Sequence, residues 1–246
     1  MRALPMVLAA DPAAHATALE LLDRAIELGP QDAVAISLAA WCHGLRAGHH
    51  FTRAPGSERR AALGLAARAS ALNAVDPLAD AMLSAAYMLA HDLVAAETHA
   101  RRALAMDGGS AWGWGRLAWV HAYRGETAQT IECCQIARVL APSDPLGFVW
   151  SIGIAAANFE LGRYDQAVRW YRRALVEQPK AVWINRFLAS AAALAGKKEE
   201  ARHSRVILGR TFPDLTIAQI RTGLPHTPLL LDRLAEGLES IGMPIS

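Results

Sequence analysis

The sequence repeats one short pattern along most of its length. The clearest copy covers residues 146–179, where Gly162 separates two apolar stretches and a proline closes the unit. In its second half Ala167, Tyr171 and Ala174 recur at intervals of four and three, which places them on one face of a helix. Shifting the sequence by about 34 to 37 residues finds the pattern again, as expected of a repeat protein. The pattern predicts stacked pairs of helices.

The neighbouring copies have the same punctuation. They turn at Gly125 and Gly196 and close at Pro142 and Pro213. In the downstream copy Ala201, Arg205 and Leu208 are the predicted buried face. Small residues on such a face let two helices approach closely, and a proline cannot continue a helix interior. One pair cannot bury its apolar face alone, whereas a stack of pairs can.

Composition excludes several classes of protein. The net charge of +2 arises from 25 basic and 23 acidic residues without a basic stripe, so we expect no contact with nucleic acid. No uncharged apolar run reaches the length of a membrane span, so we expect no membrane association. The three cysteines, Cys42, Cys133 and Cys134, form no disulfide or metal pattern and suit a reducing cytoplasm.

The sequence predicts no enzyme and no cofactor. It contains none of the motifs GxSxG, GxxxxGK[ST] or HExxH. Its histidines, His99 among them, have no serine, cysteine or aspartate partner at a readable spacing. We therefore expect no catalytic residues.

An insertion is predicted near residues 48–58, between the two helices of one pair. It brings His49 and His50 close to His43, but no fourth ligand is evident, so we expect a solvated loop and no metal site.

These turns, small-residue faces and closing prolines resemble the tetratricopeptide repeat (TPR) family over residues 14–213, in about five or six units. The resemblance implies an all-α solenoid with a right-handed superhelical twist. It also implies that the first helix of each pair lines a concave face that holds a protein or peptide partner.

Counting along the expected first helices gives the candidate partner-binding residues. They are aromatic side chains, methionines, one isoleucine and two arginines, and the aromatic and arginine types are enriched at binding hot spots. The set is Trp41, Met82, Met88, Trp112, Arg116, Trp119, Tyr123, Ile152, Phe159, Trp183, Arg186 and Phe187. The two arginines are candidates to pair with carboxylates of a peptide. Apolar residues at this spacing also form the core between repeats, and the sequence leaves both interpretations open.

A narrower resemblance involves residues 140–168 and 212–244. These segments look like the C-terminal half of bacterial regulators in which TPR units follow a winged-helix domain or a class III adenylate/guanylate cyclase domain. No segment here matches either output domain. The expected organisation is a TPR array over residues 1–213, with a shortened first unit, and an extension over 214–246 that carries a capping helix. The shortened start suggests that the chain is a piece of a larger regulator.

The leading hypothesis is a cytoplasmic, non-catalytic scaffold for protein interaction in bacterial signalling. A small-molecule sensor and a self-association module, which implies a homo-oligomer, are the alternatives.

Overall fold

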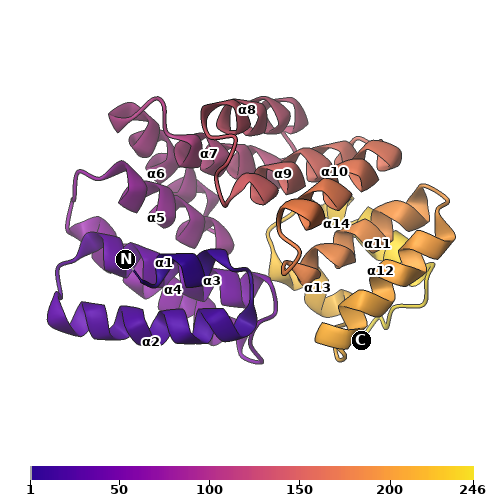
Figure 1. Ribbon diagram of the computed structural model, residues 1–246, viewed down its shortest axis with the longest axis horizontal. Coiled ribbons are helices and arrows are strands. Elements are labelled where there is room, and N and C mark those ends of the chain that lie inside the picture. Colours follow the sequence, from indigo (N-terminus) through magenta and orange to yellow (C-terminus); the bar gives the residue numbers. More distant parts are fainter. Residues whose placement is uncertain (1) are drawn as a thin grey trace. The chain divides into compact units, whose positions relative to one another are not determined.

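The computed structural model describes residues 2–246, and they form an all-α structure (Figure 1). The helices of the first half are α1 (Leu4–Leu8), α2 (Pro12–Leu28), α3 (Ala33–Gly48), α4 (Pro55–Ala71), α5 (Pro77–Leu89), α6 (Leu93–Met106) and α7 (Ala111–Tyr123). Those of the second half are α8 (Thr127–Leu140), α9 (Gly147–Glu160), α10 (Tyr164–Glu177), the 3-10 helix η1 (Val182–Ile184), α11 (Asn185–Leu194), α12 (Lys198–Thr211), α13 (Ile217–Gly223) and α14 (Pro228–Glu239). The predicted fold class, paired helices as in TPR arrays, is confirmed.

The helices pack as consecutive pairs. Extensive contacts join α3 with α4, α5 with α6, α9 with α10, and α11 with α12. First helices of neighbouring pairs also touch, as α3 and α5 do. A first helix is therefore enclosed on several sides, and most of α3, α5, α9 and α11 is buried.

The chain divides into two compact units, residues 1–120 and 121–246. The division falls inside α7. Residues 214–246, which the sequence sets apart as an extension, belong to the same compact unit as α8 to α12.

The glycine turns within the pairs lie where the sequence places them. Gly125, Gly162 and Gly196 follow α7, α9 and α11 with φ of 77°, 72° and 75°. This left-handed conformation is disfavoured for residues with a Cβ. A backbone hydrogen bond spanning five residues closes each turn, as from Arg163 N to Asn158 O at 2.9 Å.

Small residues line the buried faces of the second helices. Ala96, Ala100 and Ala103 are fully buried in α6, and Ala167 and Ala174 are fully buried in α10. These positions allow the close helix contacts that the sequence predicts.

The buried face of α12, called the seam below, differs from the predicted one at one residue. Arg205 is exposed, and Ser204 is buried between Ala201 and Leu208 instead. The buried residues of the seam recur at intervals of three and then four residues. The small serine therefore occupies the buried position, and the long charged arginine stays in solvent.

The predicted insertion at residues 48–58 is shorter than expected. α3 continues to Gly48, and α4 already begins at Pro55. Proline suits the first turn of a helix because its φ is preset and its missing N–H would have no partner there. Residues 49–54 therefore form the connection, and the remaining residues lengthen the two helices.

The N-terminal helix is short. α1 has five residues, against 17 in α2. The ring Nε2 of His15 lies 2.9 Å from the carbonyl oxygen of Val7 and ties the two helices together. Burial lowers the pKa of His15 to about 4.

All three cysteines are free thiols in buried positions. Burial raises the pKa of Cys42 to about 12, so its thiol stays protonated at neutral pH. Across residues 2–246, the helices are too short or too polar to cross a membrane.

The seam of α12 provides a test of the packing. Leu208 is 1% exposed, and Val206 on the same helix is 51% exposed. We expect Leu208→Ala to lower the free energy of unfolding by about 2–5 kcal/mol because it leaves a cavity. Val206→Ala, the control, should change it by less than about 0.5 kcal/mol. Urea unfolding followed by circular dichroism measures both values, and equal losses would contradict the assignment of the seam.

Candidate functional site

The first candidate cluster lies on the first helices α3 and α7 of the N-terminal unit. The rings of Trp41 and Trp112 meet edge to face with centroids 5.7 Å apart. The guanidinium carbon of Arg116 lies 4.4 Å from the Trp41 ring and 5.9 Å from the Trp112 ring. Trp112 and Arg116 share a face of α7 because four residues separate them. Arg116 is 4% exposed, so this cation is held against aromatic faces rather than offered to solvent.

The second cluster surrounds Arg186 at the start of α11 in the C-terminal unit. Its guanidinium carbon lies 4.8 Å from the ring of Phe187 and 5.6 Å from the ring of Trp183. Tyr171 of α10 stacks on Phe187 at 5.8 Å. Burial lowers the pKa of Arg186 to about 10, so the side chain remains charged at neutral pH. The cluster is therefore a charged group inside an aromatic enclosure.

Most of the predicted partner-binding residues are buried. Trp112 is half-buried, and the buried ones are Trp41, Met82, Met88, Arg116, Trp119, Tyr123, Ile152, Phe159, Trp183, Arg186 and Phe187. The structure does not present this set to solvent as an open surface. The sequence could not separate groove from core, because helical periodicity marks the apolar side of a helix whatever covers it.

Part of that covering comes from the C-terminal segment of the same unit. The ring of His226 meets Tyr123 at 4.9 Å and Phe187 at 5.7 Å, edge to face in both cases. Arg233 of α14 donates a hydrogen bond of 3.4 Å to the carbonyl oxygen of Phe159. Three predicted binding residues therefore lie against the chain's own segment around α14.

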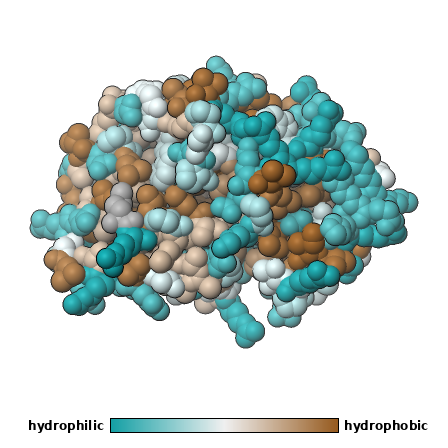
Figure 2. Space-filling model, in the orientation of Figure 1, coloured by the Kyte–Doolittle hydropathy of each residue, from teal (hydrophilic) through white to brown (hydrophobic). Residues whose placement is uncertain are grey.

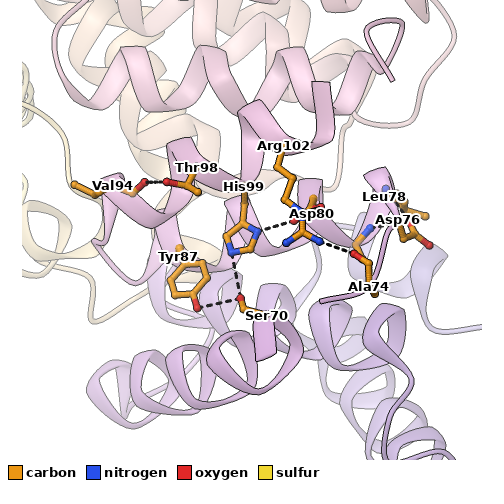
Figure 3. Close-up of polar contacts among 11 residues, drawn as sticks. Ser70, Ala74, Asp76, Leu78, Asp80, Tyr87, Val94, Thr98, His99 and Arg102 are labelled. Carbon is orange, nitrogen blue, oxygen red and sulfur yellow. Dashed lines mark hydrogen bonds and ion pairs between the residues drawn. The ribbon is translucent and has the colours of Figure 1, made fainter. Parts of the chain in front are cut away.

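A polar cluster that no sequence pattern predicted joins α4, α5 and α6 (Figure 3). His99 Nδ1 lies 2.6 Å from Asp80 Oδ1, and His99 Nε2 lies 3.1 Å from Ser70 Oγ. Arg102 Nε contacts the second oxygen of Asp80 at 3.1 Å, and Tyr87 stacks on the His99 ring at 5.4 Å. The expectation that His99 lacks a serine or aspartate partner is wrong. The lone aspartate on the otherwise apolar helix α5 was the available signal.

The order serine, histidine, aspartate resembles a nucleophile with its base, but the surroundings favour a structural role. The Tyr87 hydroxyl also lies 3.3 Å from Ser70 Oγ. The adjoining cavity holds about 10 Å³, room for about one water molecule and not for a substrate. The cluster gives the buried carboxylate of Asp80 one hydrogen bond, to His99, and one ion pair, with Arg102, and it links three helices.

We also searched the described residues for groups of side chains that could bind a metal ion. Among residues 2–246, no three His, Cys, Asp or Glu side chains are grouped to hold a metal ion. His43, one of the three histidines near the connection, places Nδ1 at 2.5 Å from Glu58 Oε2, and Arg46 Nε lies 2.8 Å from the same carboxylate. These contacts tie α3 to α4.

The comparisons with known proteins concern the fold. No protein-family model matches the chain, and no curated protein matches it at a significant level. The solved structure of TTC0263, a TPR protein of Thermus thermophilus, matches with a TM-score of 0.56 at 20% identity, over 74% of this chain and 92% of that one. The fold is that of a TPR protein.

Two further TPR-like matches come from different settings. The type IV pilus biogenesis factor PilW matches with a TM-score of 0.56 at 17% identity, over 76% of this chain and 82% of its own. A chain of the APC/C hetero-tetramer Cut9–Hcn1 matches with a TM-score of 0.60 at 16% identity, over 85% of this chain and 40% of its own. At such identities the likeness establishes the TPR fold alone.

The Asp80 cluster predicts a large structural effect. Asp80→Ala should lower the free energy of unfolding by about 3–5 kcal/mol, because it leaves the buried ring of His99 and the half-buried Arg102 without the carboxylate that pairs with them. Asp76→Ala at the start of the same helix is the control. It removes a helix cap that accepts from Leu78 N and Ala79 N, at a cost of about 0.5–2 kcal/mol. Denaturant unfolding compares the two, and a smaller loss for Asp80→Ala would contradict the structural role.

His226 predicts a dependence of stability on pH. Burial, with a smaller contribution from Arg186, lowers its pKa from 6.5 to about 3. The unfolded chain therefore binds more protons than the folded chain between these values. Stability is complete above about pH 6.5 and falls with pH, by up to about 1.4 kcal/mol per unit. His226→Phe should flatten this slope in unfolding measured from pH 7 to pH 4. An unchanged slope would contradict the account of His226.

Proposed function

We propose that the chain is a non-catalytic TPR scaffold that binds a segment of a partner protein on the faces of its first helices. One observation carries the proposal: the first helices α9 and α11 already hold an amphipathic helix, α14, on their surface. A helix bound side-on through leucines is one of the recurring modes of peptide recognition. We further propose that the scaffold is the interaction region of a bacterial regulatory or signalling protein in the cytoplasm.

Two other observations support the proposal. In the N-terminal unit, Trp112 is the half-buried member of an aromatic cluster with Trp41 and Arg116, the residue types that dominate binding energies. The Cut9–Hcn1 structure is a hetero-tetramer, so a similar fold takes part in a protein assembly there. The second helices α10 and α12 carry more charged residues than the first helices α9 and α11. Hydrophilic residues gather over α10 and α12 (Figure 2).

A matched pair of tryptophans tests the proposed face. Trp112 lies on a first helix, whereas Trp170 lies on the second helix α10 beside Arg138 and Arg173, and both are half-buried. We expect Trp112→Ala to weaken binding of a captured partner by about thirtyfold, the size of a hot-spot loss of about 2 kcal/mol. Trp170→Ala should leave binding within about twofold of the wild type.

The measurement has two stages. Affinity capture with quantitative mass spectrometry compares wild type, Trp112→Ala and Trp170→Ala, and calorimetry with the purified partner gives the Kd values. Circular dichroism confirms that both variants are folded. Equal losses for the two variants, or no loss for Trp112→Ala, would contradict a binding face on the first helices.

A further inference from the structure

α14 lies across the first helices of two consecutive pairs. It packs against α11 and also against α9. Leu230, Leu234 and Leu238 follow one face of α14 and are at most 1% exposed. The capping helix expected in residues 214–246 therefore contacts the first helices of two pairs rather than of one.

At one position of this interface a glycine packs against a serine. A Cβ atom at Gly237 of α14 would lie 2.2 Å from the Oγ atom and 2.7 Å from the carbonyl oxygen of Ser190 in α11. Ser190 Oγ also donates a hydrogen bond of 3.3 Å to the carbonyl oxygen of Arg233. Only a residue without a side chain fits at Gly237 while α14 is docked.

Polar contacts fix the direction of the docked helix. Thr227 Oγ1 donates to Glu160 Oε1 at 2.5 Å and accepts from Leu230 N at 3.1 Å, so it caps α14 and attaches it to α9. Arg233 donates to the carbonyl oxygens of Phe159 and Glu160, at the C-terminal end of α9. A cation is favourable there because the last carbonyl groups of a helix carry partial negative charge. The contact between α14 and the helices α9 and α11 thus has one tight position, at Ser190, and one site for a cation, at the end of α9.

α14 docks together with its neighbours in sequence. The first N–H groups of α13, those of Ile217 and Ala218, donate to the carbonyl oxygens of Pro244 and Ile245 at 2.9 and 3.0 Å. Side chains that the sequence assigns to partner binding, Tyr123 and Phe187, lie against His226, immediately before the helix cap. Residues of a predicted binding face are therefore occupied from within the same unit.

We propose that the surface of α9 and α11 is a helix-binding groove that α14 keeps closed, and that its external ligand is an amphipathic helix of another protein. This proposal rests on the proposed scaffold function and names its partner class. The ligand helix repeats the face of α14: leucines at positions i, i+4 and i+8, glycine at i+7, and an arginine or lysine at i+3. Because α14 competes for the groove, only molecules with an open groove bind the ligand. The apparent affinity is therefore the intrinsic affinity multiplied by the fraction of molecules whose groove is open.

The test uses the full chain and a labelled peptide of residues 226–241 as the probe. Gly237→Leu expels α14, because the new side chain overlaps the backbone of Ser190. Gly209→Leu is the matched control, since Gly209 lies in helix α12 and a Cβ there meets nothing within 4 Å. We expect Gly237→Leu to bind the peptide at least about tenfold more tightly than wild type or Gly209→Leu.

A second variant opens the groove without adding bulk. Arg233→Ala removes the hydrogen bonds to the end of α9, and such charged hydrogen bonds contribute enough to change the opening equilibrium by about tenfold. It should bind the peptide more tightly than wild type. A peptide with leucine in place of glycine at 237 should not bind any of the proteins.

Each alternative outcome is decisive. If the peptide binds wild type as tightly as Gly237→Leu, α14 does not close the groove, although the scaffold function stands. If it binds neither opened variant while both keep their helical circular dichroism, the scaffold function fails at this face as well. If both variants lose their helical signal, α14 is part of the folding core and the proposal is wrong. A wild-type dimer that the peptide dissociates would identify a second copy as the occupant and contradict an external partner.

Discussion

The helices of this protein pack at close range because small residues line their contacts. Fully buried alanines such as Ala100 and Ala174 let each second helix approach its neighbours, and the left-handed glycine turns return the chain for the next contact. The same principle operates once more outside the pairs, where Gly237 lets α14 approach Ser190 of α11. A single kind of contact thus builds the array and also attaches the helix that covers it.

Close packing of the helices buries many of the polar and aromatic side chains on the first helices. First helices are enclosed by their neighbours, so their tryptophans and arginines form buried clusters such as the one around Arg186. In the C-terminal unit, the proposed recognition surface is that of α9 and α11. There α14 makes leucine, glycine and arginine contacts, which a helix of another protein would have to replace. Under the proposal, one surface serves both recognition of a partner helix and docking of α14.

The sequence predicts the regular part of the molecule well. Gly162 marks its turn because glycine adopts this left-handed φ at the lowest steric cost, and Ala167 marks a buried helix face because a larger side chain would not fit there. It fails where distant segments meet. The contact of His99 with Ser70 and Asp80 depends on the stacking of three helices, and no local spacing encodes it. Whether Phe159 lies in a groove or in the core depends on the position of α14. Helical periodicity in the sequence does not predict that position.

If α14 is a docked occupant of a separately folded surface, it must open while α9 and α11 stay folded. Native-state hydrogen exchange of the wild-type chain, read by mass spectrometry, measures this opening. We expect amides of α14 to exchange through a local opening, at least about tenfold faster than amides in the middle of α9 and α11. Exchange of α14, α9 and α11 at one common rate would show that they open only together, and would contradict the docking of α14 on a separately folded surface.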